Sequence, residues 1–499
     1  MNQFILSIDQ GTTSSRVVIY DKNFIVIDSL QKDVEQFFPK DGWVEHDAYT
    51  IWKDVKKLIE DILAKNSIDS SQILSIGISN QRETTVLWDK TNGIPVNKAI
   101  VWQDRRTIDI CQKLRDQKLE KKVQKITGLI IDPYFSATKI KWILDNNPKA
   151  KRLYEEKKLL FGTIDTWLLW NLTERKSHLT DITNASRTML YDLKNEIWST
   201  EILQSLNIPK DILPKVTQNT YNFGSTNLFG DSIPIGGMAG DQQASAIGLS
   251  CFAKGQTKST YGTGCFLLMN IGEKFKLSSN NLITSVAFKI GDKKMYCFEG
   301  SIFVAGSAIQ WLRDKLFFFK DAKQTEILYS EANKSENVVI VPALTGLGAP
   351  HWNPNARGAI FGLTRNTAIP EIVKATLDSL VFQTFDLINI MEKDSNIKIK
   401  GIYVDGGMAD NNKFIQSLSD ILQIEIIKPN NVEASVLGAA YLAYINYNSQ
   451  KNNNELAINI DKYNVKDSIS FFPKIDKSST NSKLMKWKKA VSALITFHN

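Results

Sequence analysis

Hydrophobic residues near the start of the chain occur in short runs that polar turn residues separate. Phe4–Ile8 is apolar and β-prone, residues 9–14 have turn chemistry, and Arg16–Tyr20 returns to an apolar, β-prone pattern. A further apolar run covers Phe24–Ile27. This pattern predicts a strand, a tight turn, a second strand and a third strand.

The pattern then changes from strand to helix and back. Between residues 51 and 63, apolar side chains recur at helical spacing and would share one face. Ile73–Ile78 follows as a continuous apolar run, which is typical of a buried strand. Strands that alternate with helices predict an α/β protein.

The second half of the chain begins like the first. Thr257–Tyr261 leads through Gly262-Thr263-Gly264 into Cys265–Met269, again strand, Gly-Thr turn and strand. A second repeat relates Ala-Ser-Ala-Ile-Gly at 244–248 to Ala-Ser-Val-Leu-Gly at 434–438. We interpret the chain as two copies of one α/β unit, with domains at 1–250 and 251–499.

The amino-acid composition and charge indicate an ordinary globular protein. The chain has 499 residues, of which 43% are hydrophobic and 23% charged, as in ordinary globular proteins with more than one domain. The net charge of +8 is scattered, and many Lys residues neighbour an acid, as in Lys53-Asp54. A mixed solvated surface is therefore favoured over a nucleic-acid groove.

Four cysteines in so long a chain form no disulfide framework, and none belongs to a Cys-x-x-Cys pair. The N-terminus has no basic region, and Asp9 interrupts its apolar run, so we expect no signal peptide. No apolar run is long enough to span a bilayer. We expect a cytoplasmic protein without membrane insertion.

Two Gly-Thr turns are candidate phosphate sites. In residues 9–16, Asp-Gln-Gly-Thr-Thr-Ser-Ser-Arg, backbone N–H groups and hydroxyls could surround an anion, Asp9 could hold Mg²⁺, and Arg16 could add a positive charge. An ordinary hairpin is the alternative. Tyr261-Gly262-Thr263-Gly264 is weak alone, but the pair of turns indicates two phosphate-binding loops that face one another across a cleft.

Three further segments carry candidate chemistry. Residues 404–411, Val-Asp-Gly-Gly-Met-Ala-Asp-Asn, join a strand to a helix, which suits a nucleotide, or a plain turn with Asp410 or Asn411 as N-cap. Asp241 would stand at a strand tip, as a general base or as a helix N-cap. Arg82 and Glu83 could both reach one ligand only if the chain turns there; a solvated surface pair is the alternative.

Other nucleotide motifs are missing from the sequence. It contains neither the P-loop pattern nor the protein-kinase set, and its four His residues show no metal spacing. Phosphoryl transfer would therefore need a different nucleotide fold.

Together these segments resemble the FGGY family of carbohydrate kinases, and within it the glycerol kinase branch. The resemblance rests on the motifs at 9–16, 80–84, 131–135, 240–243, 261–265 and 404–407, with further agreement at 161–167, 183–189 and 346–350. It runs from residue 4 to about residue 490.

The resemblance implies two ribonuclease-H-like domains of the actin and hexokinase type, with ATP and Mg²⁺ in the cleft between them. It implies transfer of phosphate from ATP to glycerol, with Asp241 as general base and Asp9 as metal ligand, in a homodimer or homotetramer. Glycerol would meet Arg82, Glu83, Trp102, Tyr134, Asp241, Gln242 and Phe266. The nucleotide would meet Thr12, Thr13, Ser14, Arg16, Thr263, Gly306, Gln310, Gly407 and Asn411.

The sequence departs from the family in two regulatory segments. Some relatives bind fructose 1,6-bisphosphate through an Arg, and residues 228–232 contain none. Others carry a phosphorylatable His slightly earlier, and residues 220–224 contain none. We therefore expect neither control to operate.

Overall fold

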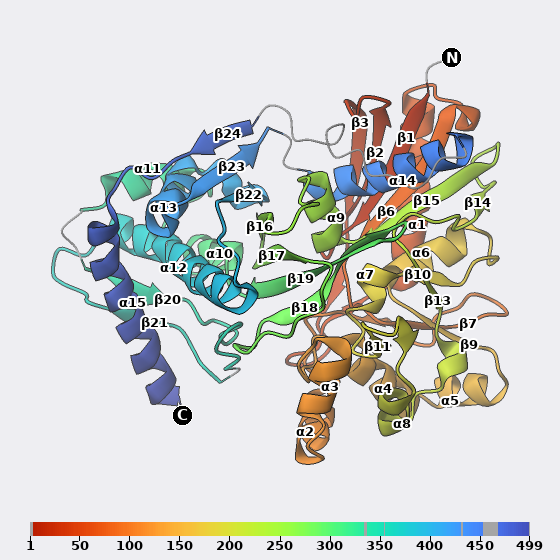
Figure 1. Cartoon of the computed structure of the whole chain (residues 1–499), viewed down its shortest axis with the longest axis horizontal. Coiled ribbons are helices and arrows are strands. Elements are labelled where there is room, and N and C mark those ends of the chain that lie inside the picture. Colours follow the sequence, from red (N-terminus) through yellow and green to blue (C-terminus); the bar gives the residue numbers. More distant parts are fainter. Residues whose placement is uncertain (1–2, 334–336, 354, 431–432, 453–467, 499) are drawn as a thin grey trace.

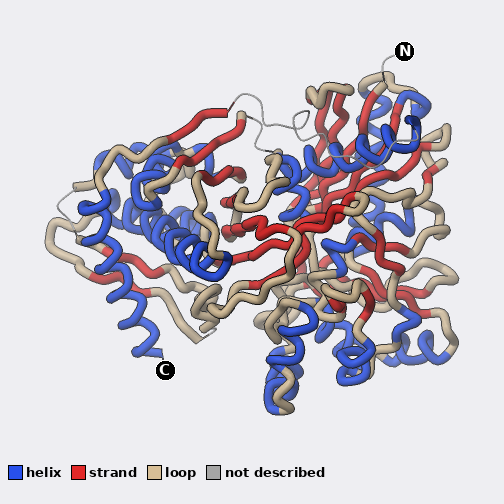
Figure 2. The backbone as a smooth tube through the Cα atoms, viewed as in Figure 1, coloured by secondary structure: helices blue, strands red, loops and turns tan. Residues whose placement is uncertain are grey.

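The computed structural model describes residues 3–333, 337–353, 355–430, 433–452 and 468–498. Two lobes lie side by side, each built around a β-sheet (Figure 1). Strands form the centre of each lobe, and most helices lie outside them (Figure 2). This arrangement puts the ends of both sheets beside the gap where the lobes meet.

The first sheet has six strands and combines antiparallel with parallel pairing. The first three strands form an antiparallel meander, and two later strands add parallel to the first one. Their order is β14 (Ser225–Thr226), β15 (Ile233–Gly240), β6 (Ile73–Asn80), β1 (Phe4–Gln10), β2 (Ser14–Asp21) and β3 (Val26–Asp33).

The second sheet repeats this order and adds one strand at one edge. It has seven strands, again with an antiparallel meander beside a parallel pair. Their order is β18 (Ile283–Ile290), β19 (Lys293–Ile302), β17 (Cys265–Gly272), β16 (Thr257–Tyr261), β22 (Gly401–Asp405), β23 (Glu425–Pro429) and β24 (Ser468–Phe471). The predicted repeat of one α/β unit is therefore visible in the strand order.

Helices cover the sheets where the apolar pattern predicts burial. Ile8 of β1 and the isoleucines of β6 pack in one core with the predicted helix, α1 (Ala48–Lys65), and with α6 (Ile164–Leu172). On the second lobe the long α12 (Ile369–Ser395) packs against β17 and β19. Around it lie α10 (Gly306–Asp314), α11 (Gln324–Glu331), α13 (Asn412–Leu422), α15 (Lys477–His498), β20 (Val339–Val341) and β21 (Ala359–Phe361).

A smaller layer of helices and short strands completes the first lobe below its sheet (Figure 1). Its helices are α2 (Ile108–Asp116), α3 (Glu120–Thr127), α4 (Ser136–Asn146), α5 (Pro148–Glu155), α7 (Ile182–Ala185) and α8 (Thr200–Leu206). Its strands are β4 (Gln36–Phe37), β5 (Glu45–His46), β7 (Val86–Asp89), β8 (Ala99–Ile100), β9 (Leu159–Gly162), β10 (Leu179–Asp181), β11 (Tyr191–Asp192), β12 (Ile197–Trp198) and β13 (Lys215–Thr217).

The third predicted strand lies later in the sequence than expected. Phe24 has a φ of 62° and its N–H donates to Asp21 O at 3.0 Å, so the chain turns there. The strand β3 therefore begins at Val26 and extends to Asp33. Apolar character alone does not separate a hairpin turn from the strand that follows it.

The two copies of the Ala-Ser repeat lie against each other. They form the contact between α9 (Asp241–Gly248) and α14 (Ala434–Asn452). A Cβ added at Gly248 would lie 2.0 Å from Ala434 O, and one added at Gly438 would lie 1.8 Å from Ala244 O. The two helices can approach this closely only because both contact positions lack a side chain.

Serine hydroxyls of the same two helices bind carboxylates of both sheets. Ser435 on α14 donates to Asp9 at 2.7 Å, and Ser245 on α9 donates to Asp405 at 2.9 Å. The helix α14 also packs against β1, β6 and β15, although the sequence analysis assigned it to the second unit. The chain thus returns to the first sheet before it adds β24, the last strand of the second sheet, and the division at residue 250 stays a prediction.

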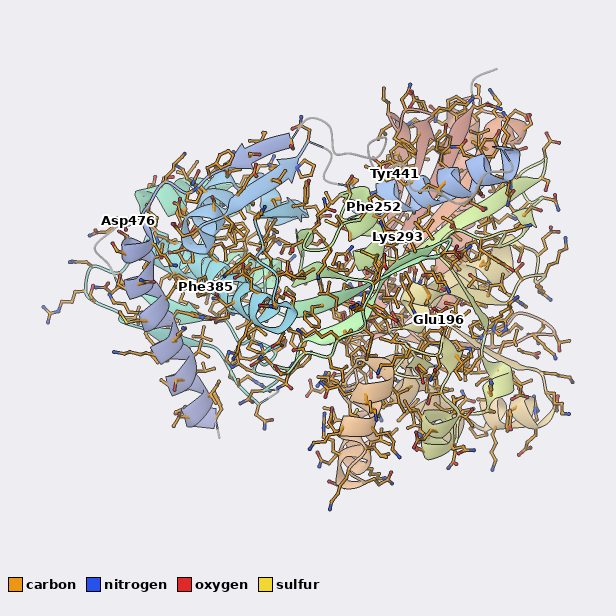
Figure 3. The ribbon with its side chains drawn as sticks, viewed as in Figure 1. Glu196, Phe252, Lys293, Phe385, Tyr441 and Asp476 are labelled. Atoms are coloured by element: carbon orange, nitrogen blue, oxygen red, sulfur yellow. The ribbon has the colours of Figure 1, made fainter. Side chains whose placement is uncertain are left out.

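A shared core lies between the lobes. It contains side chains from both sheets together with α9 and α14, including Phe252 and Tyr441 (Figure 3). Across the described part of the chain, no helix is both long and apolar enough to cross a membrane.

We predict that Gly438→Ala strongly destabilises the protein. The new methyl group would collide with the Ala244 carbonyl, and backbone on both helices would have to move. The free energy of unfolding should fall by at least about 2 kcal/mol, as measured by chemical denaturation.

Gly407→Ala is the matched control. A Cβ at Gly407 has no neighbour within 4 Å. The free energy of unfolding of this variant should stay within about 1 kcal/mol of wild type. Equal stability of the two variants would contradict the proposed helix contact.

Candidate functional site

A cavity of about 360 Å³ lies between the lobes. Both halves of the chain contribute to it, and it contains most of the predicted polyol and phosphate residues. The first half supplies Thr12, Thr13, Gln36, Arg82, Glu83, Trp102, Gln103, Tyr134, Asp241 and Gln242. The second half supplies Thr260, Gly262, Thr263, Gly264, Phe266 and Gln310.

Arg82 and Glu83 both line this cavity because the chain turns after β6. The strand ends at Asn80, Glu83 has a φ of 59°, and Thr84 N–H donates to Arg82 O at 2.6 Å. The Ser136 hydroxyl holds the turn by donating to Glu83 O at 2.9 Å. Such a turn was the condition for both side chains to reach one ligand, and the alternative of a solvated surface pair is wrong because both side chains are buried.

Asp241 projects into the cavity where β15 ends and α9 begins. Its Oδ1 accepts the Gln242 N–H at 2.7 Å and lies 3.2 Å from Arg82 Nε. The N-cap position of α9 is Gly240, so Asp241 is the first helical residue and not the N-cap. Its carboxylate stays partly exposed to the cavity, with 29% of the side chain accessible.

Two buried residues complete a charge network that the sequence analysis missed. Glu299 on β19 accepts from Arg82 at 2.7 Å, and Arg187 beyond α7 donates to Glu83 at 2.5 Å. Arg187 and Glu299 also lie 3.3 Å apart. The residues come from distant segments, and no local spacing signals that they meet. Arg187 stands within the family-like stretch 183–189, which was the only available hint.

The two arginines of the network favour the charged forms of its buried glutamates. Burial opposes ionisation of Glu299, but attraction to Arg187 and Arg82 lowers its pKa to about 2. Burial raises the pKa of Glu83, and the same two arginines oppose that rise. The two guanidinium groups balance the two glutamates, which leaves Asp241 as the additional carboxylate.

Three aromatic rings form one wall of the cavity. The Trp102 ring lies 5.5 Å from Tyr134 and 5.9 Å from Phe266, measured between centroids. Trp102 Nε1 donates to Thr12 Oγ1 at 2.8 Å, so the wall is attached to the first Gly-Thr turn. Arg187 lies over the Tyr134 ring at 5.0 Å.

The first Gly-Thr turn is a hairpin that also faces the cavity. Gly11 N–H closes it by donating to Ser14 O at 2.9 Å, and Thr12 and Thr13 line the cavity. The hairpin and phosphate interpretations are therefore compatible. Ser14 begins β2 outside the cavity lining, and Arg16 pairs with Gln31 and Glu433.

Asp9 has the chemistry of a cation ligand. Its Oδ2 accepts from Ser435, whereas its buried Oδ1 has no hydrogen-bond partner of normal geometry among the described residues. Burial raises the pKa of Asp9, and hydrogen bonds from Ser435 and Ser79 oppose the rise. A divalent cation would satisfy the free oxygen, so the residue fits Mg²⁺.

The glycine turns of the second lobe converge beside Thr263. Gly306 N–H donates to Gly262 O at 2.9 Å, where a Cβ would lie only 2.6 Å from that oxygen. Gly406 has a φ of 88° and packs directly on the backbone of Tyr261, so that a Cβ there would also collide. Gly407 therefore lies close to Tyr261. Of the predicted nucleotide residues here, Thr263 and Gln310 line the cavity.

Asn411 has a structural role in this conformation. Its side chain accepts the Phe414 N–H at 3.0 Å as the N-cap of α13, and its amide donates to Thr325 at 3.1 Å. This is one of the two N-cap alternatives that the sequence left open, and Asp410 is not the cap.

Models of one protein family match both halves of the chain. The N-terminal domain of the FGGY family of carbohydrate kinases matches residues 4–248. The C-terminal domain of that family matches residues 257–447. The chain belongs to the FGGY family of carbohydrate kinases. The family predicted from the sequence motifs is thereby confirmed.

Relatives of this FGGY kinase cover its full length. Glycerol kinase 1 of Clostridium tetani is 47% identical over 493 residues, which cover 98% of each chain. The glycerol kinase of Bacillus subtilis is 46% identical over 502 residues and covers all of both chains.

Solved structures confirm the expected fold of two actin- and hexokinase-like domains. The structure of Plasmodium falciparum glycerol kinase with ADP has a TM-score of 0.91 and 36% identity, and covers 99% of this chain and 98% of that one. A xylulose kinase from Lactobacillus acidophilus, with a TM-score of 0.87 and 23% identity over 99% of both chains, shares the fold.

We predict that Glu299→Gln destabilises this kinase. The substitution keeps the size of the side chain but leaves two buried guanidinium groups with one glutamate fewer. The free energy of unfolding should fall by about 3 kcal/mol, because removal of one partner from a buried ion pair leaves a charge uncompensated.

Glu196→Gln is the control for this experiment. Glu196 pairs with Lys289 and Lys294 near the surface, and 30% of its side chain is accessible (Figure 3). Its loss should cost less than about 1 kcal/mol. If both variants unfold at the same denaturant concentration, the buried network does not stabilise the native state.

Proposed function

We propose that this chain transfers the γ-phosphoryl group of ATP to glycerol, giving glycerol 3-phosphate and ADP. The observation that carries the proposal is the shared cavity, in which Arg82, Glu83 and Asp241 stand beside two Gly-Thr turns. The names of the full-length relatives support the same substrate pair.

The cavity suits a small uncharged triol. Such a molecule has few apolar atoms, so hydrogen bonds to charged groups must supply much of its binding. Arg82 can only donate, whereas the carboxylates of Glu83 and Asp241 accept. The rings of Trp102 and Phe266 would contact the carbon chain and limit the length of the substrate.

Asp241 is the proposed general base. Of the three carboxylates that pair with Arg82, it is the one that is open to the cavity, with 29% of its side chain accessible. As a terminal hydroxyl oxygen of glycerol forms its bond to the γ-phosphorus, its proton passes to Asp241, and the bond from that phosphorus to ADP breaks. Arg82 holds the carboxylate in place from 3.2 Å.

The Gly-Thr turns would bind the phosphates of the nucleotide. Thr12, Thr13 and Thr263 line the cavity with hydroxyls, and Gly407, where a Cβ would have no neighbour within 4 Å, leaves room for a ligand beside the backbone. Gly306 packs on Gly262 O, and its contact to the nucleotide stays a prediction. We propose Asp9 as the residue that holds Mg²⁺, whose charge would offset that of the phosphates. Contacts from Ser14, Arg16, Gln310 and Asn411 to the nucleotide stay predictions.

The cellular location and the assembly of the enzyme are also proposed. By the family resemblance, the enzyme would act in the cytoplasm and assemble as a homodimer or homotetramer. Size measurements in solution, with and without glycerol, would test the assembly.

We predict that Asp241→Asn lowers kcat for glycerol by at least about 10²-fold, because the amide cannot take the proton. The measurement is glycerol-dependent release of ADP in a coupled assay, with xylulose, ribulose and erythritol compared as alternative substrates.

Asp211→Asn removes an exposed carboxylate outside the cavity lining and should leave turnover unchanged. Near-normal turnover by Asp241→Asn would refute the role of the base. ATP hydrolysis that ignores every polyol would instead refute the proposed reaction.

A further inference from the structure

Gln242 lines the cavity next to Asp241, and a buried lysine contacts its side chain. The Lys258 ammonium on β16 donates to the amide oxygen of Gln242 and, at 2.7 Å, to Thr260 Oγ1. Lys258 is completely buried, whereas Gln242 and Thr260 both belong to the cavity lining. A charged group that does not itself reach the cavity thus contacts two residues that do.

The chemistry of an ammonium group fixes the orientation of the amide. Lysine has three N–H donors and no acceptor, so the Gln242 atom that faces it has to be the oxygen. The amide nitrogen then lies on the opposite side. Among the residues that the structure describes, none accepts a hydrogen bond from Gln242 Nε2. Its N–H groups are therefore available to a ligand.

The surroundings of Lys258 supply the opposing charge that it needs. Burial lowers the pKa of Lys258, and the positive charge of Arg82 lowers it further. The carboxylates of Asp405, Asp241 and Glu299 act in the opposite direction. Asp405 is in turn held by the Ser245 hydroxyl on α9. The backbone N–H of Gln242 is bound by Asp241, so main chain and side chain are both fixed.

We propose that Lys258 is a positioning residue that holds Gln242 with its amide N–H groups toward the polyol. This inference rests on the proposed function. Asp241 and Glu83 offer only acceptors when ionised, so a hydroxyl that donates to either of them still needs a donor for its own oxygen. The oriented Gln242 supplies that donor beside the general base, in addition to Arg82.

A double-mutant cycle tests this role. Lys258→Met keeps a side chain of similar length without the charge, and Gln242→Leu removes the amide. Each should lower kcat/KM for glycerol by at least about tenfold, mainly through KM, because one oriented hydrogen bond is lost. The double variant should be no worse than Gln242→Leu alone, since Lys258 acts through Gln242.

One further measurement separates positioning from a general structural effect. The KM for ATP should stay within about twofold of wild type in Lys258→Met, whereas a distorted cleft would raise both KM values. If the losses of the two single variants multiply in the double variant, Lys258 acts independently of Gln242 and the inference is wrong.

Gln242→Glu keeps the inference testable if Lys258→Met does not fold. The new carboxylate would pair with Lys258 and preserve stability, but it would present an oxygen to the cavity where the amide presents N–H groups. We expect a loss of kcat/KM of at least about tenfold, with thermal stability retained. Wild-type kinetics in this variant would overturn the inference.

The same assays distinguish a failure of the proposed function from a failure of the role assigned to Lys258. A wild-type enzyme that does not release ADP in response to glycerol refutes the proposed function, and this inference with it. A wild-type enzyme that turns over glycerol, combined with multiplicative losses in the cycle, refutes only the role of Lys258.

Discussion

The close contact between α9 and α14 is the constraint on which the rest of the structure depends. Two glycines, Gly248 and Gly438, let each helix touch the backbone of the other. The helix α14 packs on the first sheet, while α9 contacts β16, β17 and β18 of the second. Each lobe therefore meets a helix from the other half of the chain, and the cavity opens beside this junction.

The two halves share an architecture but use it for different chemistry. In both, a parallel strand pair carries a carboxylate near the cavity, at Asp9 on β1 and at Asp405 on β22. Each accepts from a serine on the helix of the other half. Both carboxylates retain a buried oxygen without a hydrogen-bond partner among the described residues, and Asp405 differs in having Lys258 nearby to offset its charge. The two halves thus place different charges around carboxylates that are held in a similar way.

Charge balance in the cleft links stability to catalysis. The groups that would bind glycerol are buried, and the desolvation cost of each is offset by a partner from another segment: Glu299 for Arg82, and Arg187 for Glu83. Since Glu299 belongs to the second lobe and Arg82 to the first, the charge balance of the proposed polyol pocket depends on both lobes. Asp241 shares Arg82 with these glutamates but stays accessible from the cavity, as its proposed role as a base requires.

The sequence by itself determined the alternating α/β pattern, the internal repeat, the two Gly-Thr turns and the family, because periodicity and turn chemistry act over a few neighbouring residues. It also placed Asp241 at a strand tip. Only the tertiary structure decided that Arg82 and Glu83 share a cavity, that Asn411 caps a helix, and that Arg187, Glu299 and Lys258 support the site. Those outcomes depend on contacts between residues up to 217 positions apart, and on burial that changes which charges are tolerated. No local sequence pattern indicates these long-range contacts or this burial.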